Sequence, residues 1–236
     1  MIDARAVVDP SAELDDGVEV GPFSVIGPDV RIGRGTVVGP HVVIRGPTVI
    51  GVDNRIFQFA SVGEMPQDKK YGGEATRLEV GDRNVVREYV TLHRGTVQDA
   101  GVTRVGNDNL FMASAHVAHD CVVGDHVIMA NGASLAGHVS VGDYAILGGF
   151  TLVHQFCSIG PHIFAAMGSA VTKDVPPYLM IAGNPARPHG INSEGLKRCG
   201  FSATDLKSLK AAYKQLYLSG QKLEDARRAL VAMAEE

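Results

Sequence analysis

A six-residue spacing of apolar residues constrains the fold more than any other feature of the chain. From Val8 an apolar residue recurs at every sixth position to Val62, the series resumes in phase at Val80, and it restarts at Val105 and runs to Val171. All 25 positions of the series are apolar, although apolar residues make up only 45% of the chain. Neither a helical period of 3.6 residues nor simple strand alternation produces this spacing. It is typical of hexapeptide repeats.

The six positions of each unit differ in residue type. With the apolar residue numbered as position one, position two is glycine in twelve units. Position five is small or β-branched almost throughout, as at Ala115 and Thr151. Positions one and five are therefore predicted to point inward, with the glycine easing the turn. Three units make one triangular coil, and coils stack about 4.8 Å apart. The pattern predicts a parallel β-helix in a mainly β protein.

The repeat defines the first of two predicted domains. Residues 1–183 form the hexapeptide-repeat β-helix, with loop insertions at 64–79 and 98–104, the second of which shifts the phase by one residue. Loops on a rigid scaffold are where binding residues usually lie. The repeat is expected to end at Val175-Pro176-Pro177, because proline cannot donate to the strand ladder.

The second predicted domain, residues 184–236, is α-helical. Ser202-Ala203-Thr204-Asp205 resembles a capping box and begins one helix, and Ser219-Gly220 separates it from another helix over 222–233. These helices are expected to cover the open end of the β-helix. They are more basic than their surroundings, through Lys207, Lys210, Lys214, Lys222, Arg227 and Arg228.

Composition excludes several classes of function. The net charge of -4 argues against a nucleic-acid-binding protein held by bulk positive charge. The first five residues contain no apolar signal region, and no apolar run is long enough to span a membrane. The three cysteines are scattered and odd in number, as in a reduced cytosolic protein. We therefore expect a cytoplasmic protein without a membrane span.

The register of the repeat places five residues on one outer edge of the β-helix. His119 is third in its unit, a turn position, and adding one and two coils gives Gly137 and Gln155. His138 and His154 neighbour this column. An imidazole of near-neutral pKa can take a proton from a hydroxyl, and a glycine N–H can donate to the oxyanion formed when that hydroxyl attacks a carbonyl. The grouping indicates acyl transfer.

Residues near His119 are expected to have other roles. Asp120 follows His119 directly and is a candidate to orient its ring, whereas His116 is sixth in its unit and is expected to face outward elsewhere on the coil. Cys121 and Cys157 occupy inward fifth positions. They are predicted to be small buried hydrophobic residues, and not thiol nucleophiles.

A zinc site is an alternative interpretation of the same segment, because His116 and His119 form a His-x-x-His pair. Zinc needs several ligands that converge on one point at about 2 Å. Gly137 and Gln155, the neighbours of His119 in the column, suit hydrogen bonding to a substrate better than ligation. We expect no metal.

The chain resembles the acyl-[acyl-carrier-protein]–UDP-N-acetylglucosamine O-acyltransferase family, whose members catalyse the first step of lipid A synthesis in Gram-negative bacteria. The resemblance covers nearly the whole chain, and it rests on six segments: 59–64 (FASVGE), 91–98 (TLHRGTVQ), 115–120 (AHVAHD), 135–139 (LAGHV), 153–157 (VHQFC) and 194–198 (EGLKR). Repeats alone occur in many acyl- and nucleotidyl-transferases, whereas this set of segments is specific.

The resemblance implies a homotrimer of left-handed β-helices with active sites in the clefts between neighbouring protomers. It implies transfer of a 3-hydroxyacyl chain from acyl carrier protein to the 3-hydroxyl of UDP-N-acetylglucosamine, without a covalent enzyme intermediate. No cofactor is implied beyond the phosphopantetheine of the carrier protein. The basic helices fit docking of an acidic carrier protein.

The resemblance also implies roles for individual residues. His119 would be the general base, Asp120 would support it, and the Gly137 N–H would hold the oxyanion. Substrate contacts are implied for Asp68, Lys70, His116, His138, His154, Gln155, Asn192, Glu194 and Arg198. Met167 matches an acyl-chain ruler, and a methionine there should shorten the groove, so the expected donor has about ten carbons.

Two departures from the family are visible. A second arginine often follows the position of Arg198, where this chain has Cys199. If that arginine holds the diphosphate, nucleotide affinity should be weaker here, or another cation should substitute. The last helical segment, ending at Ala234-Glu235-Glu236, is expected to be shorter than in the family.

Three other functions remain open on this scaffold. An acyltransferase for an N-linked sugar acceptor would carry an additional acceptor domain before the repeat. A zinc hydratase would contain stoichiometric metal. A scaffold protein would turn over no acyl donor, but that reading does not explain the histidine column.

Overall fold

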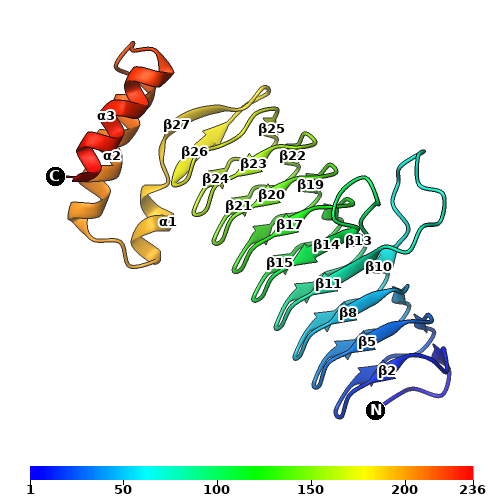
Figure 1. Ribbon diagram of the computed structural model, residues 1–236. Helices are drawn as coiled ribbons and strands as arrows, with labels where there is room; N and C mark the ends of the chain where they lie inside the picture. The colour runs from blue at the N-terminus through cyan, green and yellow to red at the C-terminus, as the bar shows by residue number, and fades with distance from the viewer. Residues whose placement is uncertain (236) are drawn as a thin grey trace.

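The computed structural model describes residues 1–235 and confirms the three-sided parallel β-helix. The chain winds through three sheets in a fixed order, so each coil adds one short strand to each sheet (Figure 1). We call the sheets B, C and A in the order in which the chain crosses them. The turns between them lie at corners BC, CA and AB.

Most strands are only two residues long, because each side of the coil is short. Sheet B contains β1 (Val7–Val8), β4 (Val25–Ile26), β7 (Val43–Ile44), β10 (Ser61–Glu64), β13 (Thr91–His93), β16 (His116–Val117), β19 (Ser134–Leu135), β22 (Leu152–Val153) and β25 (Ala170–Val171). Sheet C contains β2 (Glu13–Leu14), β5 (Val30–Ile32), β8 (Thr48–Ile50), β11 (Arg77–Val80), β14 (Val102–Val105), β17 (Val122–Val123), β20 (Ser140–Val141) and β23 (Ser158–Ile159). Sheet A contains β3 (Glu19–Val20), β6 (Val37–Val38), β9 (Arg55–Ile56), β12 (Val85–Val86), β15 (Leu110–Phe111), β18 (Ile128–Met129), β21 (Ile146–Leu147), β24 (Phe164–Ala165), β26 (Leu179–Ala182) and β27 (Arg187–Ile191).

The core follows the predicted pattern of inward positions. Met129 and Leu135 at position one, and Ala133 and Ala145 at position five, are fully buried. Because three sides converge on a narrow axis, large residues at position one alternate with small residues at position five. This alternation lets side chains from the three sides fill the interior.

Glycine at position two has a different purpose from the one predicted. The left-handed backbone of each corner lies at position four, and residues with side chains such as Phe23 and His138 adopt it. A Cβ atom on Gly33 would lie 2.7 Å from the carbonyl carbon of Gly51 in the next coil. Glycine is therefore needed because successive coils touch at position two, and not because the turn requires its φ angle.

Both loop insertions leave the β-helix at corner BC. The first joins β10 to β11 and the second joins β13 to β14, so the loops span 65–76 and 94–101. The predicted bounds, 64–79 and 98–104, were too wide for the first loop and too late for the second, because flanking residues join the strand ladders.

A column of buried asparagines at corner CA keeps the coils in register past these insertions. Asn84 Nδ2 donates to Asn54 Oδ1 (3.0 Å) and to the Gly106 carbonyl (2.9 Å), and Asn84 Oδ1 accepts from the Asn109 N–H (3.0 Å). These residues are 30 and 25 positions apart, instead of the 18 of an uninterrupted coil. The loops therefore emerge at one corner while another corner stays continuous.

The repeat does not end at Val175-Pro176-Pro177 as predicted. β26 pairs in parallel with β24, and β27 then pairs antiparallel with β26. The ring nitrogens of Pro161 and Pro177 both stack over a glycine of the preceding coil, so the two prolines occupy equivalent corner positions. Proline is tolerated there because the strand ladder needs no N–H at a corner. The predicted boundary between 183 and 184 consequently falls inside a β-hairpin.

Three helices follow the hairpin: α1 (Ser193–Arg198), α2 (Ala203–Tyr217) and α3 (Leu223–Glu235). The capping box is confirmed, since Ser202 Oγ accepts from the Asp205 N–H and the Asp205 carboxylate accepts from the Ser202 N–H. Figure 1 places α1 at the C-terminal end of the coils and α2 with α3 beyond it. Within residues 1–235, no helix is long and apolar enough to cross a membrane.

The asparagine column leads to a test of stability. Asn84→Ala should lower the free energy of unfolding by about 2–4 kcal/mol, because it leaves the Gly106 carbonyl and the Asn109 N–H buried without partners. Chemical denaturation measures this change. Asn131→Ala, at an exposed corner, is the matched control and should change stability by less than about 0.5 kcal/mol. Equal stabilities of the two variants would contradict the role of the column.

Candidate active site

His119 and Asp120 form a hydrogen-bonded pair at corner BC, on the turn from β16 to β17. His119 Nδ1 lies 2.9 Å from Asp120 Oδ2, and the two side chains are 15% and 1% exposed. The carboxylate is thus buried while the imidazole reaches the surface. With Nδ1–H donating to the carboxylate, the unprotonated nitrogen of a neutral His119 is Nε2, the atom free to act as a base.

The Asp120 carboxylate is fixed by the loop 94–101. The Thr96 N–H donates to Asp120 Oδ1 (2.8 Å) and the Thr96 hydroxyl donates to Oδ2 (2.6 Å). Thr96 is itself fully buried. Three donors, counting His119, compensate the cost of burying this carboxylate and leave it one orientation.

Gly137 lies directly beneath the His119 ring, as the register predicted. A Cβ atom at this position would be 2.5 Å from His119 Cε1 and 2.7 Å from Nε2, so only glycine lets the ring lie there. Gly137 is buried, and its N–H has no acceptor within residues 1–235. At corner CA the equivalent amides are capped by side chains, as the Asn107 N–H is by Asp125 Oδ1 (2.6 Å). A buried, uncapped N–H beside Nε2 is therefore a feature of this corner, and it is free to bind a developing negative charge.

His138 joins the cluster one coil further on. Its ring stacks on Phe156 (centroids 4.4 Å apart, 10° between planes) and meets His119 edge-on (5.1 Å). His138 Nε2 is 3.9 Å from Asp120 Oδ2, and Nδ1 is 2.9 Å from Asp99 Oδ2. His138 is thus held in place from the loop side and from the coil side.

His116 projects from β16 beside a buried histidine. His116 Nδ1 is 2.6 Å from the Thr91 hydroxyl, and its ring meets His93 edge-on at 5.1 Å. Burial, and then the nearby His93 and His119, lower the pKa of His116 to about 4. Burial also lowers the pKa of His93, whose Nδ1 has no partner within residues 1–235. Both rings are therefore neutral at physiological pH.

Four of the predicted contact residues share corner BC with His119 but do not touch it. Asp68 and Lys70 lie in the loop 65–76, where Asp68 Oδ1 accepts from the Lys70 N–H (3.0 Å). His154 and Gln155 are exposed on the turn after β22, and His154 Nδ1 contacts the Gln155 carbonyl (3.0 Å). All four lie between strands of sheets B and C, at the corner that carries His119.

The remaining predicted residues lie elsewhere on the protomer. Asn192 caps α1 by accepting from the Gly195 N–H, and its Nδ2 donates to the carbonyl of His162 at corner CA (3.0 Å). Glu194 pairs with Lys197 on the same helix (2.8 Å). Arg198 and Cys199 end α1 and are exposed. Met167 lies at corner AB and is 81% exposed. One protomer does not bring these residues to His119.

Three side chains of the site are close enough together to be considered as metal ligands. His119, Asp120 and His138 each offer a ligand atom within 4.8 Å of the others, a tighter group than the sequence suggested. However, Asp120 already accepts from Thr96 and His119, and Asp99 holds Nδ1 of His138. These groups suit proton transfer as they stand.

The cysteines do not favour nucleophilic catalysis. Cys121 and Cys157 are buried, as predicted. Burial raises the pKa of Cys121 to about 12 and also raises the pKa of Cys157. A thiolate, which is the reactive form, is therefore disfavoured at both positions.

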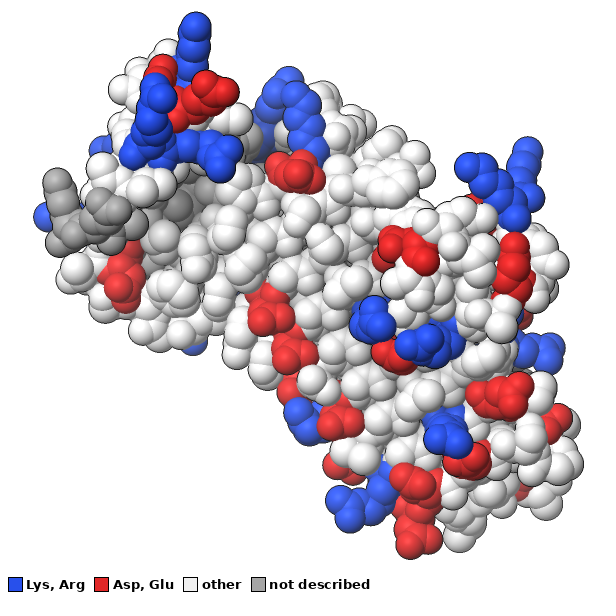
Figure 2. All heavy atoms as spheres, in the orientation of Figure 1, with Lys and Arg blue, Asp and Glu red and all other residues white. Residues whose placement is uncertain are grey.

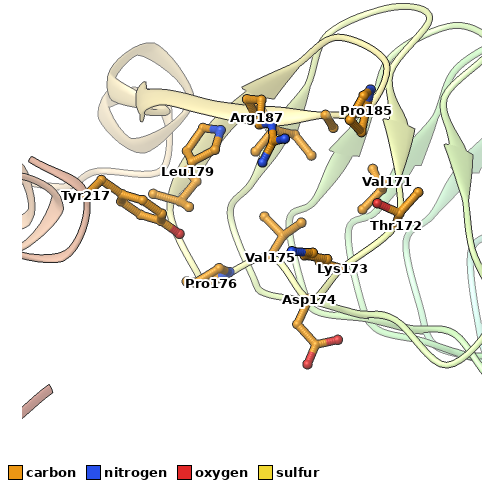
Figure 3. A pocket seen from close by; sticks show the side chains of 13 residues that line it. Val171, Thr172, Lys173, Asp174, Val175, Pro176, Leu179, Pro185, Arg187 and Tyr217 are labelled. Atoms are coloured by element: carbon orange, nitrogen blue, oxygen red, sulfur yellow. The ribbon is translucent and has the colours of Figure 1, made fainter. Parts of the chain in front are cut away.

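A separate cavity of about 250 Å³ lies at the C-terminal end of the coils, between the last turn, the β26–β27 hairpin and α2 (Figure 3). Its walls are mostly apolar, and Arg187 and Tyr217 face it. Lys173, which follows Gln155 by one coil in the corner column, also lines it. None of the His119 cluster lines this cavity.

Basic side chains gather over the C-terminal helices, whereas the coils carry mixed charges (Figure 2). The six basic residues predicted there are all exposed. They form a surface suited to an acidic partner.

The sequence did not identify Thr96, Asp99 or His93 as site residues. Thr96 and Asp99 lie in an insertion that shifts the repeat, so adding whole coils does not align them with His119. His93 lies in the regular part of the repeat, as the last residue of β13 directly before the loop. The signal available was the position of the loop, since it leaves the coil at the corner that carries His119.

Two family models match the chain: bacterial transferase hexapeptide (six repeats), at residues 11–46 and 103–137, and UDP N-acetylglucosamine O-acyltransferase, domain 2, at 174–236. The acyl-[acyl-carrier-protein]–UDP-N-acetylglucosamine O-acyltransferase of Thiobacillus denitrificans is 63% identical over 233 residues, which is 99% of this chain and 90% of that protein. The protein of the same name from Herminiimonas arsenicoxydans is 60% identical over 98% of this chain and 88% of its own length.

Solved structures agree over nearly the whole chain. LpxA from Acinetobacter baumannii matches with a TM-score of 0.95 and 49% identity, covering 97% of this chain and 89% of that one. The UDP-N-acetylglucosamine acyltransferase of Francisella novicida matches with a TM-score of 0.98 and 46% identity, covering 100% and 86%. The predicted left-handed β-helix with a C-terminal helical domain is thereby confirmed.

The lowered pKa of His116 predicts how stability depends on pH. A histidine whose pKa is about 4 when folded and about 6.5 when unfolded opposes folding as it binds a proton. Above pH 6.5 His116 is neutral in both the folded and the unfolded protein, so its titration does not reduce stability. As the pH falls from 6.5 toward 4, the unfolded protein binds the proton first, and the free energy of unfolding decreases. His116→Asn should reduce this loss by about 2 kcal/mol. Denaturant titrations between pH 4.5 and 7.5, roughly the span of these pKa values, measure it.

The control for removing a histidine as such is His189→Asn, at an exposed position of β27. The prediction is wrong if the stability of His116→Asn falls with pH as steeply as that of the unmodified protein.

Proposed function

Because the chain belongs to the acyl-[acyl-carrier-protein]–UDP-N-acetylglucosamine O-acyltransferase family, and is therefore an acyltransferase, we propose that it transfers a 3-hydroxyacyl chain from acyl carrier protein to the 3-hydroxyl of UDP-N-acetylglucosamine. This is the first step of lipid A synthesis. One observation carries the proposal: His119 is held by a buried carboxylate and lies against the unpaired N–H of Gly137.

His119 is the general base of the proposed reaction. Its Nδ1–H is fixed on Asp120, so Nε2 takes the proton of the sugar 3-hydroxyl as the oxygen attacks the thioester carbonyl. The buried Asp120 carboxylate stabilises the imidazolium that forms. Thr96 keeps that carboxylate aligned.

The Gly137 N–H stabilises the negative charge that develops on the carbonyl oxygen. The tetrahedral intermediate then collapses, the carbon–sulfur bond breaks, and the imidazolium returns its proton to the leaving thiolate of the carrier protein. The acyl chain passes directly to the sugar. The raised pKa of Cys121 and of Cys157 supports a route without a covalent enzyme intermediate.

The other predicted residues are assigned to substrate binding. His116, His138, His154 and Gln155 border the corner at which the sugar and the pantetheine arm meet. The loop residues Asp68 and Lys70 bind the sugar nucleotide. Asn192, Glu194 and Arg198 bind its nucleotide end from a neighbouring protomer.

A homotrimer is part of the proposal, because the site of one protomer is incomplete. Large apolar side chains on the outside of the coils support it: Phe150, Leu152 and Met167 are 70%, 55% and 81% exposed. Contact with other protomers would cover this surface. The exposed basic residues of α2 and α3 support docking of the acidic carrier protein.

The proposed reaction is tested directly with the purified protein, UDP-N-acetylglucosamine and a mixture of 3-hydroxyacyl carrier proteins. Mass spectrometry should detect a sugar nucleotide heavier by one 3-hydroxyacyl group. Metal analysis of the same sample distinguishes a zinc enzyme. Absence of any acylated product would refute the proposal.

His119→Ala should lower the turnover number by about 10²–10⁴-fold, because it removes the base while the coil remains intact. The rate of acyl transfer and the oligomeric state in solution are measured together. His189→Ala, distant from the corner column, should behave as the unmodified protein does. Retention of more than a few per cent of activity would exclude His119 as the base.

Met167→Gly should shift the preferred acyl donor from about ten carbons to a longer chain, because the methionine side chain no longer fills the groove. Competition among carrier proteins loaded with different chain lengths measures this preference. An unchanged preference would show that Met167 is not the ruler.

A further inference from the structure

The loop 94–101 contacts the site through two side chains, Thr96 and Asp99. Thr96 is fully buried and anchors the loop on Asp120. Asp99 is at the exposed tip, where its side chain is 52% accessible. Even so, its carboxylate reaches a ring two coils further on than the coil from which the loop leaves, with Asp99 Oδ2 2.9 Å from His138 Nδ1.

His138 is enclosed by groups from three parts of the chain. Asp99 faces Nδ1 from the loop, and Phe156 of the next coil stacks on the ring. Asp120 and His119, on the preceding coil, face its other edge at 3.9 Å and 5.1 Å. The titratable groups that face His138 are therefore Asp99, Asp120 and His119. The hydrogen bond from His138 lowers the pKa of Asp99, so this carboxyl is ionised at neutral pH.

This arrangement fixes which nitrogen of His138 carries the proton. An ionised carboxylate can only accept, so Nδ1 must be the donor. In neutral His138, Nε2 is then the acceptor. Nε2 is too far from Asp120 for a hydrogen bond, at 3.9 Å, and faces the same space as His119. It can accept from an N–H or O–H of a bound substrate.

We propose that Asp99 is a positioning residue of the acyl-transfer site: it locks the orientation and tautomer of His138, so that His138 Nε2 presents an acceptor to the substrate. The inference rests on the proposed function, since it gives His138 its substrate contact. The loop thereby has two separate roles. Thr96 aligns the carboxylate behind the base, and Asp99 aligns the second imidazole.

A purely structural role for Asp99 is a poor account of these contacts. Thr96 already ties the loop to the coil, and backbone bonds close the loop at Thr96 itself, whose carbonyl accepts from the Gly101 N–H (3.1 Å). A single hydrogen bond to an exposed carboxylate adds little stability. The effect of Asp99 should therefore appear in catalysis and in the state of His138, and not in the stability of the protein.

The test compares Asp99→Ala with Asp99→Asn. Asp99→Ala should reduce kcat/KM by about 3- to 10-fold, the effect of losing one hydrogen bond, with an unchanged melting temperature. Asp99→Asn should stay within about twofold, because its amide oxygen still accepts from Nδ1–H. Gln98→Ala, an exposed neighbour in the same loop, is the matched control and should have no effect.

Nitrogen NMR of histidine-labelled protein supplies a readout that is independent of activity. In the unmodified protein, the neutral His138 signal should belong to the Nδ1–H tautomer, and Asp99→Ala should shift it toward the Nε2–H tautomer. The signal is assigned by its loss in His138→Gln. The inference is overturned if either the kcat/KM or the tautomer of His138 is the same in Asp99→Ala as in the unmodified protein.

The experiment also separates this inference from the proposed function. If the unmodified protein forms no acylated sugar nucleotide, the proposed function fails, while the tautomer measurement still reports on Asp99. If the unmodified protein is active, His119→Ala is inactive and Asp99→Ala is as active as the unmodified protein, only the inference fails.

Discussion

Hydrogen bonding between successive coils is the interaction on which the rest of the structure depends. It converts a fixed separation in sequence into direct contact, so that His119 lies on Gly137 although 17 residues intervene. The same contact imposes glycine at position two, where backbones touch, and it tolerates left-handed residues with side chains at position four. Asp120 and His138 have this backbone, but so do corner residues far from the site. The geometry of the site is thus inherited from the coil, and it stores no special strain.

The site forms at the corner where the coil is interrupted. At the uninterrupted corner CA, side chains such as Asp125 cap the corner amides. At corner BC, the loop 94–101 places Thr96 and Asp99 over the turn. There Thr96 bonds to Asp120 and Asp99 bonds to His138, so the loop encloses the imidazoles of His119 and His138. Burial of the Asp120 carboxylate is tolerated because Thr96 and His119 donate three hydrogen bonds to it. The column of Asn54, Asn84 and Asn109 permits the interruption, since it holds the opposite corner in register.

The sequence predicted whatever follows from the period of the repeat. The inward positions, the contact of His119 with Gly137 and the burial of Cys121 are all consequences of counting in coils. The predictions failed where the six-residue spacing of the repeat is interrupted or ends. Thr96 and Asp99 were missed because an insertion has no defined register, and β26 was missed because its coil has two residues fewer, with Ala165 paired to Ile181. A proline at a corner was mistaken for the end of the ladder, because the sequence does not show which amides the ladder uses.

The candidate residues lie at three different corners of the β-helix. His119 lies at corner BC, Met167 at corner AB, and Asn192 is tied to corner CA. Because each corner is fixed by strands on both sides, a rigid coil cannot bring residues of different corners into contact. If all three act on one substrate, they must come from different protomers, and a rotation about an axis parallel to the coils lets unlike corners of identical chains meet. Under the proposed function, the rigidity that positions His119 so closely therefore also makes association of protomers a condition for a complete site.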